Sequence, residues 1–133
     1  RERIRRKLSL EQGQQLAFAS LCYQQIVDQN GRPVPPEALR DQKFTLVTGI
    51  ARPEPLTAFL RDNGIRFEHL RFPDHHAFSG PELERLRQRL PVLTTEKDAV
   101  RLEGALQEFC VLPVQHCFSA EDEKVMARFL SRL

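Results

Sequence analysis

From residue 44 onward, apolar and polar positions follow a pattern that predicts strands and helices in turn. The segment FTLVTGI at 44–50 is nearly all apolar, as expected for a strand covered on both faces. A helix is expected between Pro53, which suits a first helical turn, and Gly64, which suits a C-terminal cap. The segment IRFEHLRF at 65–72 predicts a second strand. The apolar side of the helix between these strands consists of Leu56, Phe59 and Leu60.

The rest of the chain, from residue 73 onward, continues this alternation. Three hydroxyl residues, Ser79, Thr95 and Ser119, are each followed three residues later by an acidic residue, the pattern of a capping box that starts a helix. Short apolar segments at 91–95 and 108–114 predict two more strands. The residues expected to face inward are Leu83, Leu86 and Leu90 on the first of these helices, and Val125, Met126, Phe129, Leu130 and Leu133 on the last.

Alternating strands and helices predict an α/β fold, a small layered domain with a mostly parallel sheet of about four strands. The first 40 residues differ. Residues 14–27 are ambiguous between helix and strand, but their aromatic and β-branched content favours a long strand. Residues 28–43 hold three prolines and many charges, which indicates a linker or surface loop. We therefore divide the chain into 1–40, a basic start with linker strand and Pro-rich loop, and 41–133, the α/β lobe.

The charge of the chain is small and unevenly placed. Its 133 residues suit one domain, with a net charge of +2. Residues 1–7 carry five basic side chains against one acidic side chain, so the body is slightly acidic and is not a nucleic-acid-binding domain by charge. The basic start could touch anionic phosphate or a membrane surface, or be a solvated terminus. Because the first residue is arginine, we expect the chain to be part of a longer protein.

Several kinds of site are missing from the sequence. None of the six glycines is followed by lysine, so the chain lacks the Gly-Lys-Ser/Thr loop that cradles a triphosphate. The four histidines have no cysteine or acidic partner at a zinc-type spacing, so no metal site is expected. No apolar run is long enough to span a bilayer. We interpret Cys22, Cys110 and Cys117 as reduced thiols of a cytoplasmic protein, two of them buried.

Candidate chemistry gathers where the predicted parallel strands end. Ligands of open parallel sheets bind outside the carboxyl ends of the strands, where loops from several strands converge. Three loops lie there, at 48–51, 72–78 and 94–98. The polar residues that they contribute are Thr48 and Gly49 from the first, Asp74, His75 and His76 from the second, and Thr95, Glu96, Lys97 and Asp98 from the third.

Each of these groups has a functional and a structural interpretation. A histidine is the side chain best matched to moving a proton at pH 7, and a neighbouring aspartate can orient its ring. Alternatively, Asp74 caps a turn and both histidines lie on the surface. Glu96, Lys97 and Asp98 could belong to the site or to a charged first helical turn. Gly49 could mark a close approach to a ligand or only a tight turn.

Three segments of the chain resemble the lipid A 4′-kinase (tetraacyldisaccharide 4′-kinase) family. They are LVTGIARPEPL at 46–56, GIRFEHLRFPDHHAFS at 64–79 and VLTTEKDAVRL at 92–102, in the family's order and spacing. The second contains an aromatic-x-Asp-His-x-x-aromatic signature from Phe72 to Phe78. The segment LAFASLCYQQIV looks like the family's linker between two lobes, so the resemblance extends from about residue 4 to the end.

This resemblance implies an enzyme that uses ATP and Mg²⁺ to phosphorylate the 4′-hydroxyl of a tetraacyldisaccharide 1-phosphate in lipid A biosynthesis. It implies that an N-terminal P-loop lobe, absent from this sequence, holds the nucleotide, the metal and a membrane anchor. The expected partners are that lobe, the lipid A disaccharide precursor and the cytoplasmic face of the bacterial inner membrane. By itself, the chain is then expected to be soluble, inactive and without a tightly bound cofactor.

The resemblance also implies roles for individual residues. His75 matches the family's histidine, which acts with an aspartate of the P-loop lobe to activate the sugar hydroxyl. We infer that Asp74 steadies His75 or its loop, and we assign no role to His76. The expected nucleotide and substrate cleft consists of Thr48, Gly49, Thr95, Glu96, Lys97 and Asp98.

Two other functions remain open. Asp-His-His also occurs in manganese phosphoesterases, but such enzymes need further aspartates to bridge two metals, and the sequence has no Asp-x-Asp pair. Alternatively, the chain is an interaction module that binds a partner through its basic start and its long first strand, since an exposed edge strand can pair with another chain.

Overall fold

The structure, a computed structural model, describes residues 1–89 and 91–132. The chain folds as two compact units. The central unit is Tyr23–Val114, and the terminal unit combines Arg1–Cys22 with Gln115–Leu133. Residues 23–40 therefore belong with the sheet rather than before it, because the strand at 27–28 pairs with it and Leu39 is buried in its core. The proposed division at residue 40 differs from these units.

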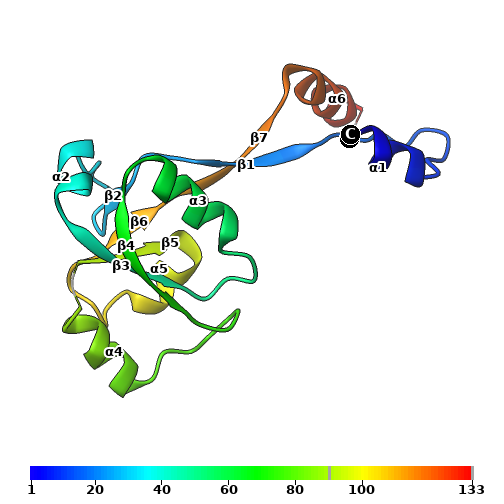
Figure 1. Cartoon of the computed structure of the whole chain (residues 1–133). Coiled ribbons are helices and arrows are strands. Elements are labelled where there is room, and N and C mark those ends of the chain that lie inside the picture. The colour runs from blue at the N-terminus through cyan, green and yellow to red at the C-terminus, as the bar shows by residue number, and fades with distance from the viewer. Residues whose placement is uncertain (90, 133) are drawn as a thin grey trace. The chain divides into compact units, whose positions relative to one another are not determined.

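The central unit contains a five-stranded sheet in the order β2-β6-β5-β3-β4 (Figure 1). The pairs β3–β4, β3–β5 and β5–β6 are parallel, whereas β2 joins β6 antiparallel. This confirms an α/β fold with a mostly parallel sheet; the strand beyond the four expected is the short edge strand β2. The strands are β2 Val27–Asp28, β3 Lys43–Thr48, β4 Arg66–Arg71, β5 Val92–Thr95 and β6 Cys110–Leu112.

Helices follow the strands as the pattern predicted. The bounds are α2 Pro36–Asp41, α3 Glu54–Asp62, α4 Gly80–Arg87 and α5 Glu96–Leu102. Ser79 and Glu82 form the predicted capping box of α4, and the Thr95 hydroxyl accepts the N–H of Asp98 at the start of α5. Helix α2 was not expected in the Pro-rich segment. It forms because Pro36 suits the first helical turn and Leu39 can be buried beneath it.

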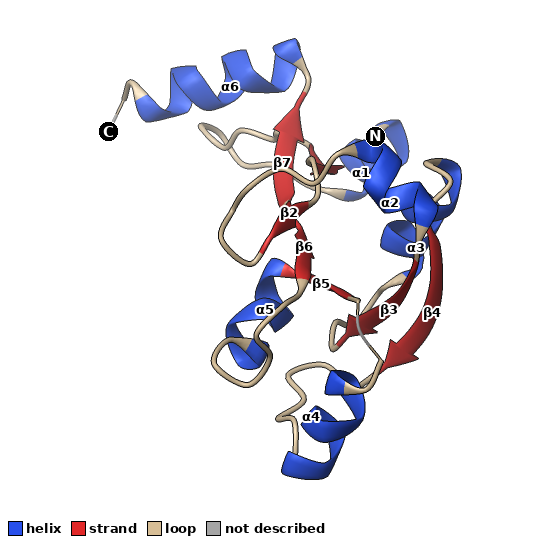
Figure 2. Cartoon of the chain, turned by 90° about the vertical axis from the view of Figure 1, so that its left-hand side faces the viewer, coloured by secondary structure: helices blue, strands red, loops and turns tan. Residues whose placement is uncertain are grey.

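Two hydrophobic clusters hold the helices of the central unit. Alternate residues of β3 point to opposite faces: Phe44 and Leu46 belong to one cluster, and Val47 belongs to the other. Helix α3 contributes Leu56 and Leu60 to the first cluster, whereas α4 and α5 contribute Leu86 and Leu102 to the second. Figure 2 shows β3 and β4 side by side, in agreement with their parallel pairing. Leu90, predicted to face inward from the helix after residue 79, lies outside the described residues.

The terminal unit is built on a two-stranded sheet of β1 and β7. Its elements are α1 Glu2–Lys7, β1 Ala19–Tyr23, β7 Val114–Phe118 and α6 Ala120–Leu130, with Tyr23 and Val114 at the boundary to the central unit. The predicted long strand at 14–27 is thus two short strands in different sheets. The predicted strand at 108–114 ends at Leu112 because Pro113 has no N–H to donate, and β7 begins after it.

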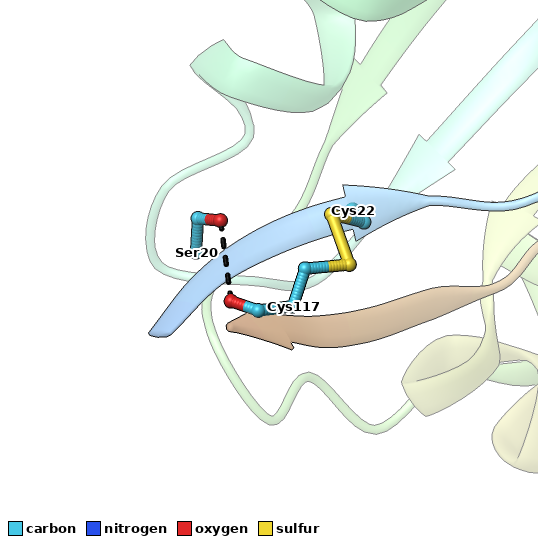
Figure 3. The surroundings of a disulfide bond; sticks show 3 residues. All are labelled: Ser20, Cys22 and Cys117. Atoms are coloured by element: carbon cyan, nitrogen blue, oxygen red, sulfur yellow. Dashed lines mark hydrogen bonds between the residues drawn. A yellow bond between two sulfur atoms is a disulfide. The ribbon is translucent and has the colours of Figure 1, made fainter. Parts of the chain in front are cut away.

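A disulfide joins Cys22 of β1 to Cys117 of β7, with the two Cα atoms 6.0 Å apart (Figure 3). This corrects the expectation of three reduced thiols. The pairing of β1 with β7 brings together two cysteines 95 positions apart, which no spacing rule reveals. Cys110 is the free thiol and is half-buried.

Ser119 is the N-cap of α6, as predicted, and its hydroxyl accepts the N–H of Asp122. The prediction that the apolar side of this helix faces inward is wrong, because Met126, Phe129 and Leu130 are exposed. The buried residue of the helix is Asp122, which accepts the N–H of Phe18 at 3.0 Å and pairs with Arg1 at 2.8 Å. The physical reason is that a two-stranded sheet offers too little apolar surface to cover a helix. Leu133 lies outside the described residues.

Within the described chain, no helix has the length and apolarity needed to cross a bilayer.

Candidate functional site

The loops that follow β3 and β4 lie against each other at the carboxyl edge of the sheet. Thr48 is opposite Arg71 in the register of the two strands. The Phe72 N–H donates to the Thr48 carbonyl at 2.7 Å, and the His75 N–H donates to the Gly49 carbonyl at 3.3 Å. The loop with Asp74, His75 and His76 is therefore attached to the end of β3.

His75 has an unusual backbone conformation. Its φ is +60°, and it is the one non-glycine residue with positive φ among the described residues. This left-handed region is unfavourable for residues with a Cβ. Non-glycine residues in it cluster at functional sites, where the surrounding structure must hold their backbone. The turn is closed by the His76 N–H, which donates to the Pro73 carbonyl at 3.1 Å. The conformation directs His75 and His76 to different sides of the loop.

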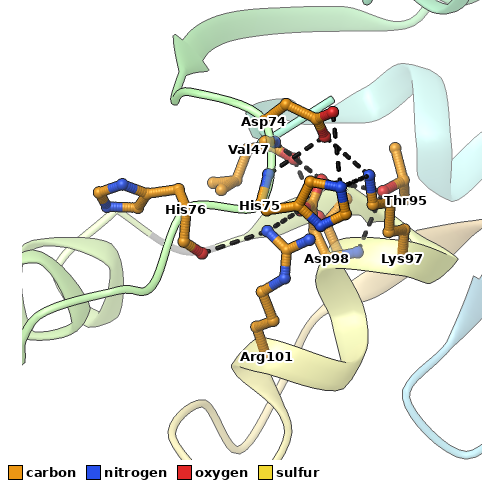
Figure 4. Close-up of polar contacts among 10 residues, drawn as sticks. Val47, Asp74, His75, His76, Thr95, Lys97, Asp98 and Arg101 are labelled. Atoms are coloured by element: carbon orange, nitrogen blue, oxygen red, sulfur yellow. Dashed lines mark hydrogen bonds and ion pairs between the residues drawn. The ribbon is translucent and has the colours of Figure 1, made fainter. Parts of the chain in front are cut away.

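Asp74, His75 and Lys97 form an exposed cluster at this edge (Figure 4). The Lys97 ammonium donates to Asp74 Oδ1 at 2.7 Å and lies 3.5 Å from His75 Nε2, which is 3.7 Å from Asp74 Oδ2. The His75 side chain is 75% exposed, so its ring is open to a substrate. The hydrogen bond from Lys97 lowers the pKa of Asp74, which is therefore a carboxylate at neutral pH. The cluster can accept and return a proton.

His76 belongs to a different environment. Its ring stacks on Phe72 with centroids 4.8 Å apart, and its Nε2 lies 3.0 Å from Glu82 Oε2. Figure 4 shows the ring directed away from the Asp74 cluster. The Glu82 carboxylate accepts the Ser79 N–H and bonds His76, and these contacts lower the pKa of Glu82 to about 2. His76 thus attaches the loop to the start of α4.

Most of the other predicted site residues lie beneath the edge rather than on it. Thr48, Thr95 and Asp98 are buried, and the Thr48 hydroxyl contacts His69 Nε2 at 2.8 Å. Burial lowers the pKa of that histidine. Glu96 is exposed, and its carboxylate accepts the Val114 N–H at 3.0 Å. Of the third loop, Lys97 is the residue that the structure brings to His75.

Two contributors were missed in the sequence. Arg101 donates to the His76 carbonyl at 3.1 Å and pairs with Asp98 at 3.2 Å, and Glu82 anchors His76. The available signal for Arg101 was its spacing three residues after Asp98, which places both on one side of α5. Within the part of the chain that the structure describes, no three histidine, cysteine or acidic side chains are placed to hold a metal ion.

Comparisons with known proteins agree with this fold. A family model described as "Tetraacyldisaccharide-1-P 4′-kinase" matches residues 2–133. The tetraacyldisaccharide 4′-kinase of Flavobacterium johnsoniae is 32% identical over 120 residues, covering 86% of this chain and 35% of that protein. The Rhodopseudomonas palustris enzyme of that name is 37% identical over 106 residues, covering 74% and 31%.

A solved structure shows a related fold. It is LpxK from Aquifex aeolicus, crystallised in complex with ATP, with a TM-score of 0.57 and 19% identity, covering 92% of this chain and 38% of that chain. At this identity, the likeness concerns the fold alone. The chain spans about a third of the length of the relatives that it matches.

Proposed function

The chain belongs to the tetraacyldisaccharide-1-P 4′-kinase family, and on this premise we propose that it is the C-terminal part of a lipid kinase. The complete enzyme transfers the γ-phosphoryl group of ATP to the 4′-hydroxyl of a tetraacyldisaccharide 1-phosphate in lipid A biosynthesis. The match over residues 2–133 and the names of the relatives support this function.

The observation that carries the proposal is the exposed, left-handed His75 beside Asp74 at the carboxyl edge. Phosphoryl transfer depends mainly on positioning and charge stabilisation, and it needs a base only to receive the hydroxyl proton. The His75 ring is open to solvent and can accept that proton. The Asp74 carboxylate then faces a positively charged ring, which it stabilises by charge.

Lys97 has two effects in this arrangement. Its ammonium fixes the Asp74 carboxylate by a 2.7 Å hydrogen bond, and it adds a positive charge where a phosphorylated substrate would approach. In this proposal Lys97 and the exposed Glu96 line the substrate cleft, and the buried Thr48, Gly49, Thr95 and Asp98 support it from below.

The residues of this chain do not fit Mg²⁺-ATP as a complete site. No described cluster of three metal-binding side chains exists, and the sequence has no phosphate-binding glycine loop. We therefore assign nucleotide and Mg²⁺ to an N-terminal P-loop lobe, and we derive no step through the metal from this chain. In this proposal residues 1–40 make the connection from that lobe to the lobe at 41–133, and residues 23–40 also pair and pack with its sheet. The remaining partners in this proposal are the lipid precursor and the cytoplasmic face of the inner membrane.

The test is the variant His75→Ala in the full-length enzyme. We expect kcat to fall by at least about 10²-fold, the range for loss of a general base. His116→Ala, a histidine exposed on β7, is the matched control and should keep the kcat of the unaltered enzyme. If His75→Ala also kept that kcat, His75 would not be the base. The 133-residue chain alone should show no kinase activity.

A further inference from the structure

The left-handed conformation of His75 requires a support that the chain must supply. Its N–H donates to the Gly49 carbonyl, and its neighbour His76 offers a carbonyl to Arg101. The first contact is made by the N–H of His75 itself, and the second by the carbonyl of the next residue. What holds Gly49 and Arg101 therefore also determines where the His75 ring lies.

Gly49 is held by a buried carboxylate. Its N–H donates to Asp98 Oδ2 at 2.8 Å, and the Thr95 hydroxyl donates to the same oxygen at 2.9 Å. A Cβ at position 49 would lie 3.0 Å from Asp98 Oδ1, 3.2 Å from the Pro73 carbonyl and 3.3 Å from Arg101 Nη1. A side chain at this position would require the carboxylate, the loop or the guanidinium to move by a few tenths of an ångström.

Arg101 connects that carboxylate to the loop. Asp98 is 0% exposed, and its Oδ1 makes no hydrogen bond within the described residues but faces Arg101 Nη1 at 3.2 Å. The same nitrogen donates to the His76 carbonyl at 3.1 Å. A buried carboxylate is costly unless paired, so Asp98 fixes the guanidinium in place. The Arg101 side chain is 21% exposed.

We propose that Arg101, oriented by Asp98, is a positioning residue that keeps His75 in its left-handed conformation and its ring at the substrate edge. In this proposal Arg101 acts through its bonds to Asp98 and to the His76 carbonyl rather than on the substrate. This inference rests on the proposed role of His75. It gives Asp98, which was expected to line the cleft, a different role: it orients Arg101.

The first test measures kinetics in the full-length enzyme. Arg101→Ala should lower kcat by about 10- to 100-fold, because a displacement of about 1 Å has an effect of this size. KM should change by less than about twofold, since substrate contacts remain. Arg101→Lys keeps the charge beside Asp98 and thus the fold, and it should recover part of the lost kcat. A large rise in KM at unchanged kcat would instead make Arg101 a binding residue and overturn the proposal.

Arg87 provides a matched control. It also pairs with an acid three residues earlier, Glu84 at 2.8 Å, and donates to a backbone carbonyl, that of Ala105 at 2.9 Å. It lies on α4 and contacts no residue of the 72–78 loop in these bonds. Arg87→Ala should leave kcat and KM unchanged. An equal loss of kcat in both variants would indicate general destabilisation and would contradict the proposal.

A double variant separates this inference from the proposed function. If Arg101 acts only through His75, then Arg101→Ala should change kcat by less than about twofold in the His75→Ala background. A full additional loss would show that Arg101 acts independently, which would overturn the positioning role while leaving His75 as the base. A normal kcat in His75→Ala would instead overturn the proposed function.

Backbone NMR chemical shifts supply the readout that does not depend on activity. Those of His75, which report its positive φ, should move toward extended values in Arg101→Ala and stay in place in Arg87→Ala. Unchanged His75 shifts in Arg101→Ala would overturn the positioning role whatever happens to kcat.

Discussion

At the scale of single residues, Gly49 is a position where the atoms of the site approach one another closely: Asp98, Pro73 and Arg101 all lie next to it. It follows β3, and its two peptide groups bond in opposite directions, the N–H to Asp98 and the carbonyl to the His75 N–H. The sequence left open whether this glycine served a ligand or a turn. The structure gives a third reason, because the buried carboxylate and the loop backbone occupy the space that a side chain would need.

Gly49→Ala is therefore expected to destabilise the chain by about 1–3 kcal/mol, the range for forcing a methyl group into a packed site. Urea unfolding monitored by circular dichroism measures the change. Gly80→Ala is the control, because a Cβ there meets no atom within 4 Å and the residue lies in α4. Gly80→Ala should change the free energy of unfolding by less than about 1 kcal/mol in either direction. Equal effects of the two substitutions would contradict the close approach at Gly49.

The two adjacent histidines also differ at this scale. The sequence indicated that only one of them would enter a shared site. Backbone geometry decides which: the left-handed φ of His75 exposes its ring, while His76 stacks on Phe72 and bonds Glu82. The positive φ of His75 cannot be deduced from the adjacent residues in the sequence. The contacts that stabilise it come from Gly49, at the end of β3, and from Arg101 of α5.

At the scale of elements, the three helix starts with a hydroxyl cap were predicted correctly, whereas α1 and α2 were not predicted. Ser79, Thr95 and Ser119 each accept an N–H three residues later, as expected, because a cap involves atoms within one turn. The end of a strand at Pro113 and the helix α2 were missed, since both depend on partners distant in the chain. The capping box of α4 has the further effect of receiving His76 through Glu82.

This capping box should make stability depend on pH. The Ser79 N–H, followed by His76, lowers the pKa of Glu82 from 4.5 to about 2. Because the pKa in the folded chain is depressed, the contribution of Glu82 is present above pH 4.5 and is lost as the pH falls toward 2. Glu82→Gln should therefore lower stability at pH 7 and flatten the acid-induced loss between pH 4.5 and 2.

Urea unfolding at a series of pH values measures this effect. Glu84→Gln is the control: Glu84 is on the same helix and pairs with exposed Arg87, but it takes no part in the capping box. It should preserve the slope of stability against pH in this range. If Glu82→Gln left the slope unchanged as well, the capping box would not be the source of the acid sensitivity.

At the scale of the whole molecule, the division into two units depends on pairing between distant segments. Residues 1–22 and 115–133 form one unit around β1 and β7, and residues 23–114, which contain the five-stranded sheet, form the other. The Cys22–Cys117 disulfide belongs to the first unit and Cys110 to the second. The expectation of three reduced thiols failed because cysteine spacing carries no information about strand pairing.

The disulfide predicts a simple labelling result. When the chain is denatured without reductant and treated with an alkylating reagent, mass spectrometry should find one modified cysteine, Cys110. After reduction, it should find three. Cys110→Ser should take up no label without reductant. Three labels in the unreduced chain would show that Cys22 and Cys117 are not bonded in the purified protein.

Local interactions explain what the sequence determined by itself: the order of strands and helices, the helix caps, the α/β class and the loops at the carboxyl edge all follow from neighbouring residues. The tertiary structure alone decided which histidine is exposed, which acid is buried beneath it and which cysteines pair. The physical reason is that each of these outcomes depends on atoms brought close by strand pairing and by the packing of α5 against the sheet, and a residue's own neighbours in the chain do not reveal such contacts.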